Sequence, residues 1–153
     1  MARPVVIAGI DGSGDSVTVL RCASDYANML SADVRIVTAW NEMVYQDAVV
    51  GFHPDAIARQ MGSAAAHAVF GPVIPTWVTV VARPGPAGPA LVAEAASAEL
   101  LVVGTRGHSA IGGMLLGSVS TYCAEHSSCP VLVVPTPARD VTNDAPVGVG
   151  AQA

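Results

Sequence analysis

Lysine is missing from this chain of 153 residues, and charge of either sign is scarce. The seven basic residues are all arginine and form no cluster, against twelve acidic residues, for a net charge of −5. Without lysine the chain cannot form a P-loop, which needs a Gly-Lys pair, or a lysine Schiff base. A surface for DNA or RNA needs many cationic contacts with phosphates on one face, so we expect no nucleic-acid partner.

Cysteine is also rare, and long apolar runs are lacking. Three cysteines are too few, and odd in number, for the disulfide framework of a small secreted domain. No apolar stretch approaches the roughly 18 residues of a membrane-spanning helix. Asp11 interrupts the apolar run 4–10 before it could serve as a secretory signal. We therefore expect a cytoplasmic protein that does not contact a membrane.

The chain is rich in apolar residues, which make up 52% of the sequence. Short runs rich in Val, Ile and Leu alternate with helix-length segments, a pattern typical of a parallel sheet with helices on both faces. The predicted strands are 5–10, 34–39, 77–81, 100–103 and 131–134. The predicted helices are 15–30 with Asp15 or Ser16 as its cap, 55–70, one with Pro89 in its first turn after a turn at 83–88, and 118–126. Residues 40–54 are predicted to form a mobile loop.

This order of elements predicts an α/β fold in one domain, residues 1–135. Right-handed crossovers favour a single doubly wound five-stranded parallel sheet in the order 3-2-1-4-5, a Rossmann-like arrangement. Residues 136–153 are rich in Pro, Gly, Ala and Asp and have no apolar period. We predict that they form a flexible C-terminal tail.

A glycine-rich connection follows the predicted strand 100–103. Its pattern, Gly-x2-Gly-x9-Gly-Ser, consists of Gly104, Gly107, Gly117 and Ser118, and a predicted helix begins at its end. Glycines let backbone N–H groups approach an anion, and the first turn of a helix offers unpaired N–H groups at its positive end. The pattern predicts a phosphate-binding loop, in which the Arg106 guanidinium can contact phosphate or remain solvated.

A second unusual connection, Asp11 to Gly14, follows the first predicted strand. In the order 3-2-1-4-5 the winding reverses between strands 1 and 4, and doubly wound sheets bind ligands at that point. The two connections should therefore meet at one crevice. Asp11 there could accept hydrogen bonds from ribose or help hold Mg²⁺, or it could be an ordinary turn residue.

Four segments of the chain resemble the universal stress protein family. They are Ile10-Asp-Gly-Ser, Val102-Val-Gly-Thr-Arg-Gly-His, Leu116-Gly-Ser-Val-Ser and Cys129-Pro-Val-Leu-Val-Val. The resemblance covers residues 4–135, and the glycine pattern is similar to that of the family's ATP-binding branch. It implies a nucleotide-binding fold of the adenine nucleotide alpha hydrolase-like kind, a role in the stress response, and commonly a dimer.

The same resemblance implies where a nucleotide would lie, with ATP and Mg²⁺ as the cofactors. The residues facing ribose and adenine would be Gly9, Ile10, Asp11 and Ala39, with Val103 and Gly104 continuing the pocket. The residues holding the phosphates would be Gly107, Gly117, Ser118, Val119 and Ser120. Ser118 and Ser120 could also cap the helix, and capping uses the same N–H groups as phosphate binding.

Two further constellations imitate known sites. Cys123, His126 and Cys129 have metal-ligand spacing, but no fourth ligand is near them in the sequence, so structural cysteines are favoured. The stretch from Gly107 to Gly112 nearly matches the nucleophile elbow of serine hydrolases, with its second glycine one position late. We predict neither a metal site at these Cys and His residues nor a hydrolase.

The chain is therefore predicted to be an ATP-binding regulatory protein of the stress response, since no general base is evident. Alternatives are a slow ATPase or autophosphorylating enzyme, a nucleotide-free dimeric interaction module, and a dinucleotide binder. The last would use Gly9, Gly12 and Gly14, with Glu42 on the ribose. These glycines depart from the order Gly-x-Gly-x-x-Gly. A homodimer is predicted through strand 131–134, because an apolar edge strand invites pairing.

Overall fold

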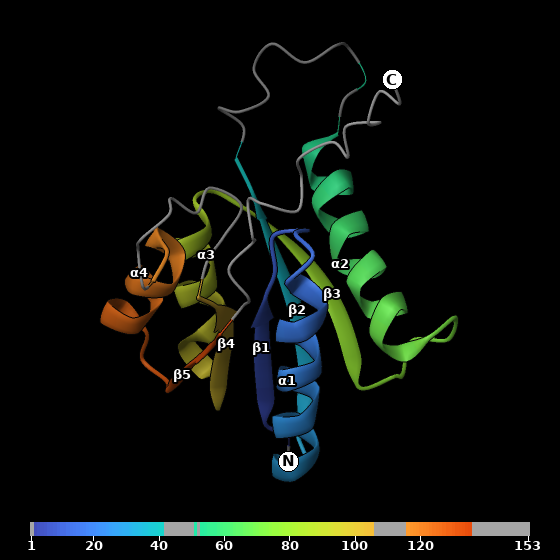
Figure 1. Ribbon diagram of the computed structural model, residues 1–153, viewed down its shortest axis with the longest axis horizontal. Helices are drawn as coiled ribbons and strands as arrows, with labels where there is room; N and C mark the ends of the chain where they lie inside the picture. Colours follow the sequence, from blue (N-terminus) through green and yellow to red (C-terminus); the bar gives the residue numbers. More distant parts are fainter. Residues whose placement is uncertain (1, 42–50, 52, 106–115, 136–153) are drawn as a thin grey trace, which may run out of the picture.

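One parallel sheet organises the molecule (Figure 1). The computed structural model describes residues 2–41, 51, 53–105 and 116–135. Five parallel strands lie in the order β3-β2-β1-β4-β5. They are β1 (Val5–Gly9), β2 (Asp33–Trp40), β3 (Val78–Pro84), β4 (Leu100–Gly104) and β5 (Val131–Val134). The predicted α/β fold, with one doubly wound sheet in the order 3-2-1-4-5, is confirmed.

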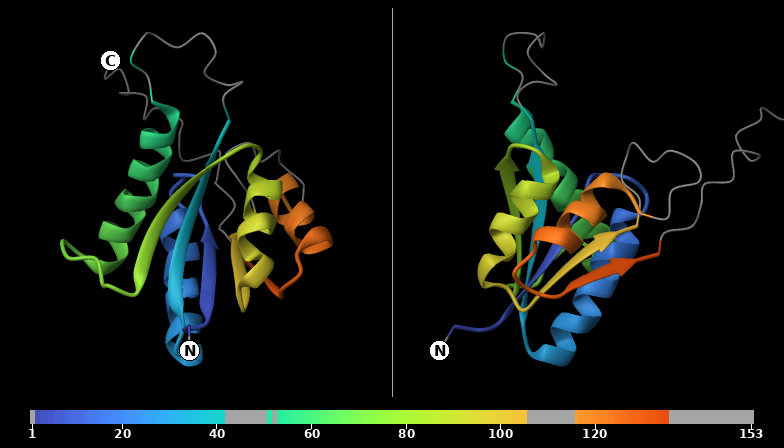
Figure 2. Two further views of the ribbon diagram at one scale, coloured as in Figure 1. Left: turned by 180° about the vertical axis from the view of Figure 1, so that it is seen from behind. Right: turned by 90° about the vertical axis from the view of Figure 1, so that its left-hand side faces the viewer.

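Helices cover both faces of this sheet (Figure 2). The first face carries α1 (Ser16–Leu30) and α2 (Pro54–Phe70). The second carries α3 (Ala87–Glu94), the short 3-10 helix η2 (Ala95–Ser97) and α4 (Ser118–His126). The helices that follow β1 and β4 thus lie on opposite faces, and the direction of winding changes between these two strands.

The central strands are apolar on both sides because both sides are covered. In β1, Val6 and Ala8 pack in the cluster beneath α1 and α2, while Ile7 packs in the cluster beneath α3 and α4. All three side chains are fully buried. This two-sided burial explains why the sequence shows a continuous apolar run where a half-exposed strand would alternate.

Strand β3 and the turn after it differ from the prediction. We expected strand 77–81 and then a turn over 83–88, but β3 continues to Pro84. A proline is tolerated there because β3 is an edge strand, where no neighbouring strand needs its N–H. The chain turns at Gly85, whose φ of +106° suits glycine. Pro89 lies in the first turn of α3, as predicted.

The two segments predicted to be irregular fall largely beyond the described part of the chain. Of the predicted loop 40–54, residues 42–50 and 52 lie outside the described residues, and Pro54 is the first residue of α2. The predicted tail 136–153 lies wholly outside them. Within the described ranges, no helix combines the length and the apolar character needed to cross a membrane.

A glycine inside α2 allows this helix to approach the sheet closely. Gly62 lies in the middle of α2 and is buried against β3. A Cβ added at Gly62 would lie 2.6 Å from Cγ1 of Val80 and 3.4 Å from Oγ1 of Thr38. The first distance is far inside van der Waals contact, and the short β-branched valine side chain has little freedom to move aside.

We therefore expect Gly62→Ala to destabilise the protein. Overpacking of this kind costs about 1–3 kcal/mol, which outweighs the gain of about 1 kcal/mol in helix propensity. Urea denaturation followed by circular dichroism measures the free energy of unfolding. Gly14→Ala is the matched control, because nothing lies within 4 Å of its added Cβ. Equal stabilities of the two variants would contradict the close contact.

Candidate functional site

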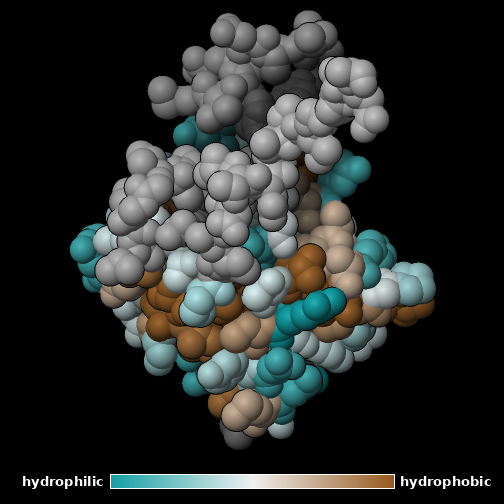
Figure 3. Space-filling view, viewed as in Figure 1, coloured by the Kyte–Doolittle hydropathy of each residue, from teal (hydrophilic) through white to brown (hydrophobic). Residues whose placement is uncertain are grey.

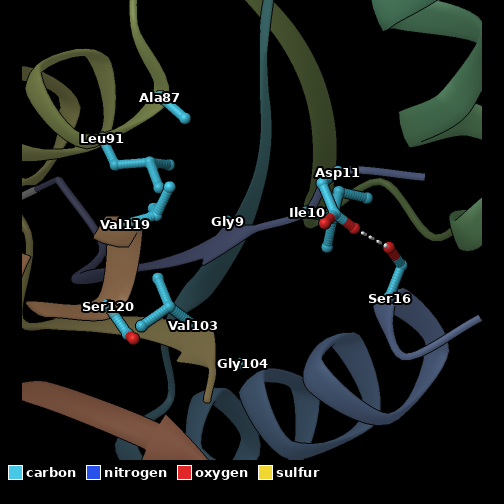
Figure 4. A pocket seen from close by; sticks show the side chains of 10 residues that line it. All are labelled: Gly9, Ile10, Asp11, Ser16, Ala87, Leu91, Val103, Gly104, Val119 and Ser120. Carbon is cyan, nitrogen blue, oxygen red and sulfur yellow. Dashed lines mark hydrogen bonds between the residues drawn. The ribbon is translucent and has the colours of Figure 1, made fainter. Parts of the chain in front are cut away.

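A cavity of about 70 Å³ opens where the carboxyl ends of β1 and β4 lie side by side (Figure 4). Its described lining residues are Gly9, Ile10, Asp11, Ser16, Ala87, Leu91, Val103, Gly104, Val119 and Ser120. They come from the ends of the two strands, the start of α1, and the helices α3 and α4. The connection after β1 and the helix after β4 thus meet at one cavity, where the strand order predicted it.

Asp11 is held at the start of α1. Its Oδ1 accepts a hydrogen bond from the backbone N–H of Ser13 at 3.0 Å and one from the Ser16 hydroxyl at 3.5 Å. Asp15 occupies the N-cap position of α1, but its side chain makes no capping hydrogen bond. Asp11 is therefore a turn residue that also lines the cavity. The two roles are compatible, because the turn uses only one of the two carboxylate oxygens.

The first turn of α4 forms the opposite side of the cavity. Gly117 is its N-cap, and no side chain caps the helix. The N–H of Gly117 donates to the Thr105 carbonyl at 2.6 Å, and the Ser120 hydroxyl donates to the carbonyls of Gly117 at 3.0 Å and Thr105 at 3.3 Å. These two donors, which the resemblance assigned to phosphate, are engaged within the protein. The first-turn N–H groups of Ser118, Val119 and Ser120 are the ones available to an anion.

Helix α3 supplies an apolar wall that the motif analysis missed. Leu91 is 4% exposed and lies over Gly9, where an added Cβ would come within 2.8 Å of Cδ1 of Leu91. The same Cβ would lie 3.2 Å from Cγ1 of Val103. Leu91 was not among the predicted site residues. The signal in the sequence was Gly9 itself, because a glycine at the end of a buried strand often marks a close approach.

The remaining predicted site residues lie at different distances from this cavity. Gly117 and Ser118 stand at the start of α4 but are not among its described lining residues. Ala39, expected at the adenine, lies near the end of β2 and is not among them either. Arg106 and Gly107 lie outside the described residues. Ser16, Ala87 and Leu91 line the cavity without having been predicted.

A wider apolar groove of about 270 Å³ adjoins the cavity at Ala87 and Val119. Its other described lining residues are Pro86, Gly88, Pro89, Ser118 and Tyr122. Tyr122 packs directly on Gly88, where an added Cβ would lie 2.8 Å from the ring. A ligand too large for the cavity can therefore extend between the first turns of α3 and α4.

The described lining carries one carboxylate and no arginine. Among the residues that the structure describes, no group of three or more His, Cys, Asp or Glu side chains could hold a metal ion. Magnesium in nucleotide sites often takes only one or two protein carboxylates and completes its shell with phosphate oxygens and water. Asp11 fits that arrangement through its second oxygen, but only if a phosphate-bearing ligand is bound alongside.

The cysteines of the metal-like spacing serve packing. Cys123 is fully buried in the cluster between α4 and the sheet, as predicted. Burial, and to a smaller extent the neighbouring Cys129, raises the pKa of its thiol to about 11. The His126 ring stacks on Tyr122 with a centroid separation of 4.1 Å, and its Nδ1 is 3.0 Å from the carbonyl oxygen of Tyr122.

Comparison with known proteins gives a family and close relatives. A model described as the universal stress protein family matches residues 2–135. A universal stress protein of Mycobacterium tuberculosis is 33% identical over 134 residues, covering 84% of this chain and 44% of that protein. One of Mycolicibacterium smegmatis is 32% identical over 141 residues, covering 87% and 46%. The chain spans about half the length of these curated relatives.

Comparison with solved structures also finds universal stress proteins. A universal stress protein crystallised in complex with cAMP has a TM-score of 0.64 and 30% identity, covering 90% of this chain and 100% of that one. A universal stress protein from Archaeoglobus fulgidus has a TM-score of 0.62 and 20% identity, covering 88% and 94%. The second likeness concerns the fold alone.

The burial of Cys123 leads to a test of its reactivity. With a pKa of about 11, only about one thiol in a thousand is ionised at pH 8, and the thiolate is the reactive form. In the folded protein we expect iodoacetamide to alkylate Cys123 at least tenfold more slowly than the half-buried Cys129, as measured by peptide mass spectrometry. In urea both should react at similar rates. Equal rates in the folded protein would show that Cys123 is accessible.

Proposed function

The chain belongs to the universal stress protein family, and from that premise we propose that it binds an adenine nucleotide between β1 and β4 as an ATP-binding regulatory protein of the stress response. The observation that carries the proposal is the meeting of two elements at one cavity. Asp11 lies on one side, and the first turn of α4, which no side chain caps, lies on the other. The first suits ribose hydroxyls and the second suits phosphate.

The size and lining of the cavity indicate which part of the nucleotide it would enclose and which part would lie outside it. The cavity of about 70 Å³ is smaller than the ~300–1,000 Å³ of common ligand pockets, so it can enclose only one part of a nucleotide. Leu91, Val103 and Val119 make much of its lining apolar, which suits the face of a base or a sugar. The phosphates would then extend toward the first turn of α4 and the adjoining groove.

For ATP, the charge of the ligand requires a partner cation. The described lining contains no arginine, and Asp11 itself is acidic. Mg²⁺ would supply positive charge beside the phosphates, and Asp11 is the carboxylate of the described lining that could help to hold it. We therefore propose that ATP binds as its magnesium complex, and that Asp11 is its protein ligand for the metal or for the ribose.

Cyclic AMP is a second candidate, favoured by two observations. The universal stress protein crystallised with cAMP is 30% identical to this chain over 90% of its length. A cyclic phosphate carries one negative charge, which the partial positive charge of a single helix N-terminus can balance without a metal. The absence of arginine among the described lining residues thus suits cAMP better than free ATP.

Isothermal titration of the protein with ATP, with and without Mg²⁺, and with cAMP separates these ligands. The proposal expects saturable binding of at least one of them with one site per chain, and a dependence on Mg²⁺ for ATP alone. Competition between ATP and cAMP would place both in the same site. If neither binds at millimolar concentration to folded protein, the proposed function is wrong.

The N-cap of α4 offers a sharper test through Gly117→Asp and Gly117→Asn. The φ of −74° and ψ of 170° at this position suit any residue, and both side chains are good N-caps, so neither variant should lose stability. A carboxylate beside the phosphate should repel it by about 1–4 kcal/mol. We expect Gly117→Asp to bind the nucleotide about 10- to 100-fold more weakly than Gly117→Asn, in the same titration. Equal affinities of the two variants would show that the phosphate does not bind at the first turn of α4.

We also propose that the protein pairs as a homodimer through β5. This strand is one edge of the sheet, and Val131, Leu132 and Val133 are only partly buried. Figure 3 shows an apolar patch where Figure 1 draws β5. A second copy of the chain could cover this edge and pair with its outer backbone groups, which no described strand pairs with.

Light scattering tests the dimer. We expect twice the chain mass at micromolar concentration, and we expect Leu132→Lys to shift the protein toward the monomer, because a charge on the edge opposes pairing. Thr79→Lys, on the exposed side of the opposite edge strand, is the control and should remain dimeric. A monomeric wild-type protein would refute the proposal, whatever the variants do.

A further inference from the structure

We propose that Ser16 is a positioning residue, which orients the Asp11 carboxylate so that the site distinguishes a ribose from a 2′-deoxyribose. The inference rests on the nucleotide binding proposed above. It concerns a residue that neither the glycine pattern nor the family resemblance pointed to. Ser16 opens α1, lines the cavity and is only 4% exposed.

The two carboxylate oxygens of Asp11 have different surroundings. Oδ1 accepts hydrogen bonds from the backbone N–H of Ser13 at 3.0 Å and from the Ser16 hydroxyl at 3.5 Å. Figure 4 shows the carboxylate with one oxygen turned to Ser16. Oδ2 has no hydrogen-bond partner among the described residues, so it is the oxygen that a ligand can engage. A ribose 2′-hydroxyl, which both ATP and cAMP carry, is a donor of the right kind.

The Ser16 hydroxyl limits the rotation of this carboxylate. With the Ser13 bond alone, the terminal torsion of an aspartate is soft, and the carboxylate can turn about its axis. A second donor on Oδ1, approaching from α1, favours the orientation that leaves Oδ2 free. The Oγ–Oδ1 distance of 3.5 Å is at the long end for a hydrogen bond, so we expect an orienting effect rather than a strong contribution to stability.

The backbone holds Ser16 where this contact requires it. Its N–H donates to the Ser13 carbonyl at 3.1 Å, which closes the turn between Asp11 and the helix. A nearly buried hydroxyl requires a hydrogen-bond partner, and Asp11 supplies it. If Ser16 acted only in helix initiation, its loss would change stability but not the discrimination between two sugars.

The test is the ratio of dissociation constants for a deoxynucleotide and its ribonucleotide, measured for the wild type, Ser16→Ala and Ser24→Ala. The ribonucleotide is whichever of ATP or cAMP the wild type binds, and its partner is the 2′-deoxy form. A lost hydrogen bond to a charged group is worth about 1.5–3 kcal/mol, so a wild-type ratio of roughly 10 or more is expected. Ser16→Ala should lower this ratio at least threefold, because it weakens the binding of the ribonucleotide more than that of the deoxynucleotide. Ser24→Ala replaces a buried serine of the same helix that does not line the cavity, so it should leave the ratio unchanged.

A double-mutant cycle with Asp11→Asn separates a positioning role from a direct one. If Ser16 acts through Asp11, Ser16→Ala should not lower the ratio further once Asp11 has been replaced. Ser16→Cys, similar in size but a weak donor, should reproduce the effect of Ser16→Ala and serves if the alanine variant fails to fold. Circular dichroism checks the fold of each variant.

The outcomes distinguish this inference from the proposed function. A wild type that binds neither nucleotide refutes both. A wild type that binds but shows no preference for ribose, or a ratio that Ser16→Ala leaves unchanged, refutes the role of Ser16 and leaves nucleotide binding standing. An effect of Ser16→Ala that persists fully in the Asp11→Asn background assigns Ser16 a direct contact and also overturns the positioning role.

Discussion

The reversal of winding between β1 and β4 is the constraint on which the site depends. These two strands are hydrogen-bonded neighbours, yet the helices that follow them lie on opposite faces of the sheet. Side chains that cover the sheet elsewhere are therefore separated at this one point, and a cavity remains at the carboxyl edge. Asp11 and the first turn of α4 meet there because the topology brings them together, although they are far apart in the sequence.

Electrostatics at this point are unusual for a proposed phosphate site. The chain has no lysine, and its described lining has no arginine. Among the described groups, the partial positive charge at the start of α4 is suited to an anion, because Gly117 leaves the first-turn N–H groups without a side-chain cap. A phosphate held by these described groups would rely on fixed dipoles rather than on mobile cationic side chains. The resulting attraction is modest in strength but strongly directional, which suits recognition more than tight retention.

Much of this arrangement could be predicted from the sequence, because its signals are local. Continuous apolar runs predicted the central strands, and the strand order predicted that the connections after β1 and β4 would meet at one cavity. The contribution of Leu91 could not be predicted in the same way, since packing of α3 on Gly9 depends on the crossing of helix and strand. The extension of β3 to Pro84 was missed because a proline argues against a strand unless the strand is known to be an edge.

The serines show a second limit of sequence reasoning. Ser120 fits a phosphate-binding pattern, but its hydroxyl is engaged by the carbonyls of Gly117 and Thr105. Ser16 was expected only as a possible helix cap, but it lies in the cavity beside Asp11. Residue type and spacing identify which groups are near one another. They do not decide which partner each hydroxyl selects, because that depends on torsion angles set by the whole fold.

The hydrogen bond from the N–H of Gly117 to the carbonyl of Thr105 has a consequence for how such a chain can change over evolutionary time. It joins the two ends of the connection between β4 and α4, so the helix is anchored to the strand independently of what lies between. Substitutions or insertions between the two bonded residues would then leave this anchor of the helix on the strand in place. A lineage could vary the length and sequence of that connection without having to rebuild its core.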